Sequence, residues 1–138
     1  MPTLQLKISP PAPADVRDAL ALELTVLTAE LLGKRPEVTA LMVEALPAAH
    51  WYIGARAEAG PTAWLEISIT AGTNTAAQKA AYIEAAHAAL ARHLGAGQPL
   101  APASYVIVRE LAAGDWGYGG QTQLARQLRR QAVPAQAK

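Results

Sequence analysis

The chain contains the same pattern twice, and this repetition limits its fold more than any other feature of the sequence. An alternating apolar and polar run at residues 4–8 is typical of a half-buried strand, and residues 65–69 repeat it. Each run is followed by turn-forming residues and then by a stretch with apolar side chains at helical spacing. Each helical stretch leads to another strand-like run, at Val38–Val43 and at Ser104–Val108. The pattern predicts two β-α-β units in tandem.

The two predicted helices have recognisable faces and ends. The first face is formed by residues three or four positions apart, namely Val16, Leu20, Leu24, Leu27 and Leu31. Gly33 suits the position just after the helix end, and Pro36 lies beyond it. The second helix is preceded by the turn and cap residues Gly72, Thr73, Asn74 and Thr75. Its apolar face comprises Ile83, Ala86, Leu90 and Leu94, and Gly95 is expected to end it.

Two such units predict an α+β fold. Right-handed crossovers make the two strands within each unit parallel, and pairing of the units gives a four-stranded sheet with two helices on one face. We expect a single structural domain, with residues 1–58 as the first unit, 59–122 as the second and 123–138 as a C-terminal tail. Glu58–Pro61 is the expected joint. The helix-free face needs a further layer, so we expect self-association, most simply as a ring of subunits.

Composition excludes several classes of function. The formal net charge is +1 and no basic stretch is interleaved with aromatic residues, so nucleic acid is not an expected partner. No apolar run reaches the length of a membrane span, and the start of the chain lacks the pattern of a signal peptide. Cysteine is absent, and the three histidines do not have metal-ligand spacing. We expect a cytoplasmic protein without a metal or cofactor.

Pro2 is the candidate for chemistry. Initiator methionine is normally removed before a small residue, so the mature chain is expected to begin with Pro2. Its secondary amine could then act as a base, because an α-amino group has a pKa of about 7.7–8.0. An apolar pocket or a nearby positive charge lowers that pKa further. Such a group would be a general base close to neutral pH.

The second unit carries a motif that gives the chain a family resemblance. It contains Gln78-Lys79, Val106-Ile107-Val108-Arg109-Glu110 and Asp115-Trp116-Gly117-Tyr118-Gly119-Gly120. With Pro2 and the β-α-β units, these residues resemble the tautomerase superfamily over roughly residues 2–122, as a fused form of 4-oxalocrotonate tautomerase. The resemblance implies proton transfer between the enol and keto forms of small 2-oxo acids. It also implies a homotrimer with one working proline per chain.

The resemblance also assigns roles to individual residues. It places Pro2 at the catalytic position, Trp116 on the pocket wall and Trp51 as its counterpart in the first unit. Two family arginines are missing, because their aligned positions hold Ala12 and Thr73-Asn74 for one and Ala40 and Tyr105 for the other. Candidate replacements are Tyr105 as a hydrogen-bond donor to an enolate, Arg109 as a relocated charge and Asn74 as a donor to a carboxylate. The favoured alternative for Asn74 is to stabilise the turn before the helix, and Arg109 could instead be a solvated residue at the end of a strand.

The sequence therefore predicts a tautomerase in which Pro2 accepts and returns a proton on a small organic acid. Because both arginines are absent, we expect weak turnover of the family's dicarboxylate substrate. One alternative is a non-catalytic structural homologue. Another is a hydratase or dehalogenase of an unsaturated acid, for which Glu44 is a loose candidate to activate water.

Overall fold

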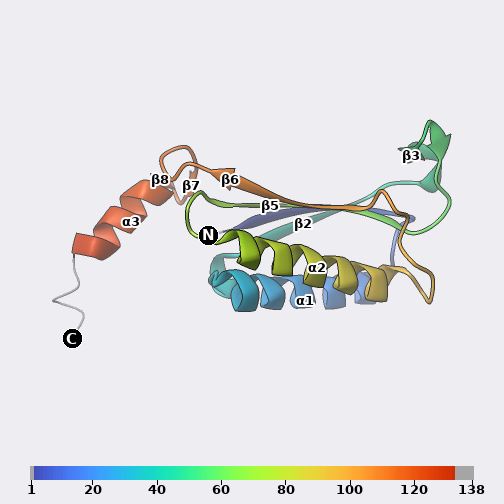
Figure 1. Cartoon of the computed structure of the whole chain (residues 1–138), viewed down its shortest axis with the longest axis horizontal. Helices are drawn as coiled ribbons and strands as arrows, with labels where there is room; N and C mark the ends of the chain where they lie inside the picture. Colours follow the sequence, from blue (N-terminus) through green and yellow to red (C-terminus); the bar gives the residue numbers. More distant parts are fainter. Residues whose placement is uncertain (1, 133–138) are drawn as a thin grey trace.

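The computed structural model describes residues 2–132, which form a four-stranded sheet with two long helices against one face (Figure 1). The first unit contains β1 (Thr3–Ser9), α1 (Ala14–Leu32) and β2 (Ala40–Ala45). The second contains β5 (Thr62–Thr70), α2 (Ala76–Leu94) and β6 (Tyr105–Leu111). The strand order is β2-β1-β5-β6, so the expected tandem β-α-β architecture is confirmed.

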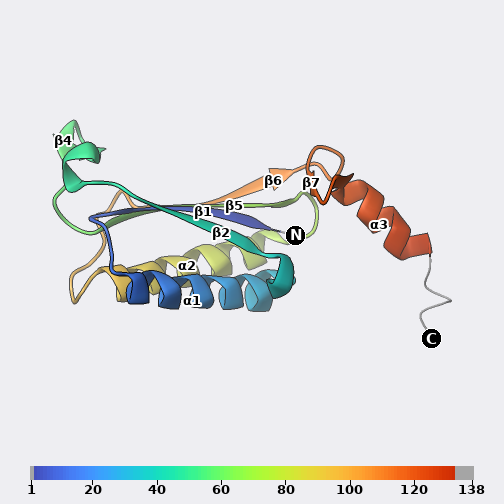
Figure 2. The ribbon, with the colours of Figure 1, turned by 180° about the vertical axis from the view of Figure 1, so that it is seen from behind.

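The two units meet at their first strands. β1 is parallel to β2 and β5 is parallel to β6, as right-handed crossovers require. β1 and β5 are antiparallel, with Thr3 opposite Ser68 and Ser9 opposite Thr62. The first strand of one unit therefore begins where that of the other unit ends. This relationship places equivalent parts of the two units at opposite ends of the sheet (Figure 2).

Short elements extend the sheet at both ends. One end carries the 3-10 turn η2 (Ala48–His50) and the hairpin strands β3 (Tyr52–Ile53) and β4 (Arg56–Ala57). The other end carries the 3-10 turn η1 (Pro36–Val38) and the hairpin strands β7 (Gly117–Tyr118) and β8 (Gln121–Thr122). Helix α3 (Gln123–Ala132) follows β8 and projects from the body, which gives most of the predicted tail a regular structure (Figure 1). Met1 and residues 133–138 lie outside the described residues.

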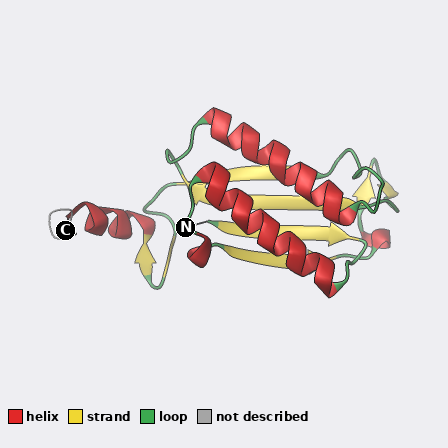
Figure 3. Cartoon of the chain, turned by 90° about the horizontal axis from the view of Figure 1, so that it is seen from below, coloured by secondary structure: helices red, strands yellow, loops and turns green. Residues whose placement is uncertain are grey.

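The core lies between the sheet and its two helices (Figure 3). Alternate residues of β1 and β5 point into it, including Leu4, Leu6, Leu65 and Ile67. Leu20 and Leu24 of α1 are buried as predicted, and the buried line continues through Thr28 and Leu32. Leu27 and Leu31 are only partly buried at its edge.

A polar contact joins the two helices inside the core. The hydroxyl groups of Thr28 on α1 and Tyr82 on α2 lie 2.9 Å apart, and both side chains are fully buried. Thr28 also donates to the carbonyl oxygen of Leu24, at 2.7 Å. Burial raises the pKa of Tyr82 to about 12. The predicted helix faces did not include this pair, because those faces were defined by aliphatic side chains alone.

The predicted helix ends are largely confirmed. Gly33 adopts a left-handed conformation (φ 70°), and its N–H donates to the carbonyl oxygen of Ala29. Thr75 and Gln78 form a capping box at the start of α2. The expected strand beginning at Val38 is wrong by two residues, because Val38 belongs to the 3-10 turn that Pro36 begins. β2 starts at Ala40.

Within residues 2–132, the face of the sheet opposite α1 and α2 remains uncovered (Figure 1). Met42 and Tyr105 on its outer strands are 54% and 58% exposed. On the inner strands, the ammonium group of Lys7 lies 5.3 Å from the ring centroid of Trp64. None of the helices in residues 2–132 is both long and apolar enough to cross a membrane.

Candidate active site

Pro2 lies at the end of the sheet where β5 finishes. It is buried, and its carbonyl oxygen accepts a hydrogen bond from the N–H of Ala40, at 3.3 Å. Because Thr3 is opposite Ser68 in an antiparallel pair, Pro2 comes opposite Ile69, one residue before the end of β5 at Thr70. Pro2 is therefore enclosed by the beginning of β2 and the end of β5.

A cavity of about 300 Å³ opens at this same end of the sheet. It is formed by the segment after α1, the end of β5, the hairpin β7–β8 and one side of α3. Its wall includes Thr70, which follows the residue opposite Pro2, and Val38, which lies just before β2. The remaining lining residues are Gly33, Lys34, Arg35, Thr73, Tyr118, Gln123, Gln127 and Arg130. The volume suits a small organic molecule.

The cavity wall is positively charged. Lys34, Arg35 and Arg130 contribute three cations, and the lining within residues 2–132 contains no acidic side chain. Arg35 forms an exposed ion pair with Glu37, at 3.4 Å. No carboxylate in the described part of the chain pairs with Lys34 or Arg130. Such a wall favours an anionic ligand.

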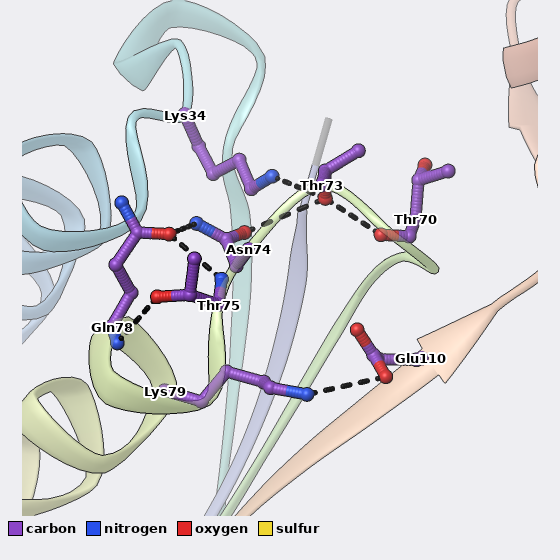
Figure 4. Close-up of polar contacts among 8 residues, drawn as sticks. All are labelled: Lys34, Thr70, Thr73, Asn74, Thr75, Gln78, Lys79 and Glu110. Atoms are coloured by element: carbon purple, nitrogen blue, oxygen red, sulfur yellow. Dashed lines mark hydrogen bonds and ion pairs between the residues drawn. The ribbon is translucent and has the colours of Figure 1, made fainter.

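Lys34 is held at the cavity by the turn before α2 (Figure 4). Its Nζ donates to Oγ1 of Thr73, at 2.9 Å, and Thr73 donates in turn to the carbonyl oxygen of Thr70, at 2.6 Å. Burial lowers the pKa of Lys34 from its usual value. The desolvated ammonium group is therefore fixed beside the end of β5, and a nearby anion would stabilise its charge.

Asn74 connects the two helices at this turn. Its Nδ2 donates to the carbonyl oxygen of Leu32, at 3.0 Å. It also donates to Oε1 of Gln78, at 3.2 Å (Figure 4). The end of α1 is thereby tied to the turn before α2. This contact helps to position Lys34, which lies two residues after Leu32. Asn74 is not among the residues that line the cavity. These contacts match the turn-stabilising alternative for this residue.

Trp116 belongs to the same end of the molecule as Pro2. Its indole Nε1 donates to Oγ1 of Thr70, at 3.2 Å, so it is bonded directly to a residue of the cavity wall. The carbonyl oxygen of Trp116 accepts a bond from the N–H of Gln123, at 2.9 Å, which links the Trp116 segment to the start of α3. Trp116 also borders a second, shallower cavity beside the hairpin β7–β8.

The start of α3 is anchored on the hairpin. The guanidinium group of Arg126 lies 3.8 Å from the ring centroid of Tyr118 and donates to the Tyr118 carbonyl oxygen, at 3.0 Å. Thr122 accepts a bond from the N–H of Ala125, at 2.9 Å, which satisfies one of the free donors at the helix start. Gln123, Gln127 and Arg130 thus face the cavity from one side of a fixed helix.

Gln123 has an unusual environment. It is only 7% exposed, and its Nε2 has no hydrogen-bond partner among the described residues. A buried donor without an acceptor costs about 1–3 kcal/mol. Because Gln123 lines the cavity, a ligand in the cavity could supply the missing acceptor.

Three of the predicted site residues, Tyr105, Trp51 and Arg109, do not line the cavity. Tyr105 begins β6 opposite Trp64, far from Pro2 along the sheet, and is exposed. Trp51 lies just before β3, at the opposite end of the sheet from the N-terminus (Figure 1). Both could contact a Pro2 site only from another subunit. Arg109 lies on the uncovered face, where its Nη1 contacts Oε2 of Glu66, at 3.5 Å.

Three residues that line the cavity were not predicted from the sequence, namely Lys34, Gln123 and Arg130. Lys34 and Arg130 carry charges that could have been noticed, but their convergence depends on how the segment after α1 meets α3. Gln123 gives no signal in the sequence. No group of three or more potential ligands for a metal ion occurs within residues 2–132.

Comparison with known proteins supports the architecture. A family model described as tautomerase enzyme matches residues 64–124, which span the second unit and the first residues of α3. A crystal structure of a native fused 4-OT is 28% identical, with a TM-score of 0.79, and the alignment covers 89% of this chain and 97% of that chain. No curated protein sequence matches the chain.

Two further solved structures have the same fold. A fused 4-OT solved as an asymmetric trimer is 25% identical, with a TM-score of 0.78, and the alignment covers 90% of this chain and 98% of that chain. A protein solved after inactivation by 2-oxo-3-pentynoate is 19% identical, with a TM-score of 0.76 and the same coverage of both chains. At that identity the last likeness concerns the fold alone.

Proposed function

Because this chain belongs to the tautomerase superfamily, we propose that it is an isomerase that moves a proton between the enol and keto forms of a small organic acid. Pro2 is the general base and acid. The observation that carries this proposal is the cavity at the end of the sheet where Pro2 lies. Pro2 itself is not among the lining residues, and the described lining has three cations and no acidic side chain. A substrate carboxylate matches that charge, and the cavity volume of about 300 Å³ suits a small acid.

The proposed reaction uses both protonation states of one amine. After removal of Met1, the Pro2 nitrogen takes the proton of the 2-hydroxyl group, and the C–O bond becomes a carbonyl. The electron pair of the adjacent carbon–carbon double bond then takes that proton from the Pro2 ammonium group. Burial disfavours the charged form of an amine, so the enclosed position of Pro2 favours the neutral base that the first step needs. General acid–base transfer of this kind contributes about 10²–10⁴-fold each time.

The other predicted residues have supporting roles in this proposal. Trp116, bonded to Thr70, forms an aromatic wall that excludes water from the amine. In a homotrimer, Tyr105 and Trp51 reach the site from a neighbouring subunit, where Tyr105 donates a hydrogen bond to the developing enolate. Arg109 adds positive charge at the same interface, and Asn74 acts by holding the turn that carries Thr73. The trimer covers the face of the sheet that lacks helices.

The hydratase or dehalogenase alternative has less support. That chemistry needs a carboxylate to activate water, and the described lining of the cavity contains none. Glu44 lies on the edge strand β2, opposite Lys7 on the uncovered face, rather than on the cavity wall. Proton transfer without added water agrees better with this arrangement.

The test compares Pro2→Ala with Pro61→Ala, a change at the equivalent start of the second unit. Intact mass first shows whether Met1 has been removed. Ketonisation of 2-hydroxymuconate and phenylenolpyruvate is then followed by absorbance. We expect Pro2→Ala to slow both reactions by at least about 10²-fold, and Pro61→Ala to retain them. Equal rates for wild type and Pro2→Ala would support a non-catalytic homologue instead.

A further inference from the structure

We propose that Lys34 and Gln123 together bind the carboxylate of the substrate, so that the C-terminal helix α3 is part of the active site. This inference rests on the proposed function and assigns the anchor for its substrate. Lys34 supplies a cation from the segment after α1, and Gln123 supplies an amide N–H from the first turn of α3. Both residues line the cavity, whose wall also includes Thr70 at the end of the sheet where Pro2 lies.

The unpaired amide of Gln123 is the first argument. Its side chain is more than nine-tenths buried and its Nε2 has no acceptor among residues 2–132. Buried polar groups normally have a partner, so we expect a ligand in the cavity that Gln123 lines to draw this donor toward an acceptor. The backbone of Gln123 is fixed by its bond to the carbonyl oxygen of Trp116. The backbone that carries the donor is therefore held in place before the ligand arrives.

The surroundings of Lys34 are the second argument. Its ammonium group has three N–H bonds, and within the described part of the chain one of them is used, on Thr73. Burial lowers the pKa of Lys34, and a bound carboxylate would restore it. Arg130 and Arg35 add positive charge to the same wall. A carboxylate would thus accept from both Lys34 and Gln123.

The repeat supplies an internal comparison. In the first unit α1 ends at Leu32 and is followed by Gly33-Lys34-Arg35, whereas in the second unit α2 ends at Leu94 and is followed by Gly95-Ala96-Gly97. The fold alone therefore does not require cations after the helix. They occur in the unit whose segment reaches the end of the sheet where Pro2 lies.

The experiment separates carboxylate binding from the reactivity of Pro2. 2-Oxo-3-pentynoate and its carboxylate-free analogue 3-pentyn-2-one are each incubated with wild type, Lys34→Met and Gln123→Met, and the rate of covalent labelling is measured by intact mass. Either reagent is attacked at its alkyne by the Pro2 nitrogen, with a proton delivered to the neighbouring carbon. Arg129→Met and Gln131→Met are matched controls on α3, because neither residue lines the cavity.

We expect each cavity variant to raise the concentration of 2-oxo-3-pentynoate needed for half-maximal labelling by about tenfold or more. Labelling by 3-pentyn-2-one should match wild type, which also shows that the variant is folded. The KM for phenylenolpyruvate should rise similarly, with kcat changed much less. Unchanged half-saturation in both cavity variants would overturn the inference.

Failure of the proposed function gives a different result. Wild type would then be labelled by neither reagent, or Pro2→Ala would be labelled as fast as wild type. Calorimetric binding of phenylpyruvate still tests the carboxylate subsite in that case. Lys34→Met and Gln123→Met should weaken that binding by about tenfold while Arg129→Met leaves it unchanged, and equal affinities would overturn the assignment.

Discussion

The indole Nε1 of Trp116 donates a hydrogen bond of 3.2 Å to Oγ1 of Thr70, which joins the segment before β7 to the last residue of β5. Thr70 also accepts at its carbonyl oxygen from Thr73, the partner of Lys34. The Trp116 indole, the end of β5 and, by way of Thr73, the Lys34 ammonium group are thus linked through one threonine. A substitution of Thr70 should therefore disturb the positions of both Trp116 and Lys34.

Thr70→Val removes the acceptor for the indole while keeping the shape of the side chain. We expect a loss of about 1 kcal/mol in the free energy of unfolding and slower labelling of Pro2 by 2-oxo-3-pentynoate. Thr25→Val is the matched control, because its hydroxyl bonds to Ala21 on the outer part of α1. Denaturant unfolding and the labelling rate are measured for both, and equal labelling rates would contradict the prediction.

Gly117→Ala should disrupt the hairpin that carries α3. A Cβ at Gly117 would clash with the carbonyl oxygen of Gln121, on the paired strand β8, so the two strands must separate. Gly114→Ala is the control, because its Cβ would make only an ordinary 3.8 Å contact with Leu124. We expect Gly117→Ala to lose at least about tenfold in kcat/KM for phenylenolpyruvate and Gly114→Ala to retain it. Similar values for the two variants would argue against a role for the hairpin.

The pair of Thr28 and Tyr82 should respond unequally to removal of either hydroxyl. In Tyr82→Phe, Thr28 keeps its bond to the carbonyl oxygen of Leu24, so we expect a cost of about 1 kcal/mol. In Thr28→Val, the Tyr82 hydroxyl stays buried without its partner, and the cost should rise toward about 3 kcal/mol. Urea unfolding of both variants measures the difference. A larger loss of stability in Tyr82→Phe than in Thr28→Val would show that Thr28 is not the main polar partner of Tyr82.

The ion pair of Glu23 with Arg92 should make the stability of the folded chain fall as the pH becomes acidic. Hydrogen bonds from Arg92 and His93 lower the pKa of Glu23 from 4.5 to about 2. Because the pKa in the folded state is lower, this contribution is fully present above pH 4.5 and is lost as the pH falls toward about 2. Glu23→Gln should therefore lower the Tm at neutral pH, and its difference from wild type should shrink on acidification. Glu30→Gln is the control, because it removes a carboxylate of the same helix that belongs to none of the ion pairs within residues 2–132.

The uncovered face of the sheet predicts a trimer in solution. Solved relatives of the fused 4-OT type are trimers, and the exposed Met42 and Tyr105 side chains lie on the face that a trimer would cover. Light scattering should give a mass of three times 14.5 kDa. Tyr105→Asp, which adds a charge to that face, should shift the equilibrium toward monomer. A wild-type mass of one chain would exclude a site shared between subunits.

The fold could be predicted from the sequence because its signals are local and occur twice. The alternation at residues 4–8 and 65–69 indicated strands, and Gly33 and Thr75 marked helix ends that the structure confirms. Boundaries were less accurate where a proline started a 3-10 turn, as at Pro36. Here the local geometry of a few residues outweighed the apolar pattern.

Most of the cavity could not be predicted, because its residues come from segments distant in the chain. Lys34 meets Thr73 across 39 positions, and Gln123 approaches them from a helix that the sequence indicated only as a tail. The resemblance named Trp116, whose place follows from the motif of the second unit. It also named Tyr105 and Trp51, which lie in the same chain at the opposite end of the sheet from Pro2.

The antiparallel pairing of β1 and β5 has a consequence for how such a chain responds to change. Fusing two units that pair through antiparallel first strands leaves the start of the second unit inside the polypeptide, where its first nitrogen is an amide. Under the proposed function, chemistry is therefore confined to one end of the sheet, although the β-α-β unit occurs at both. Thr70 and the hairpin that carries α3 belong to the second unit, so that unit encloses the cavity at the end where the first unit begins.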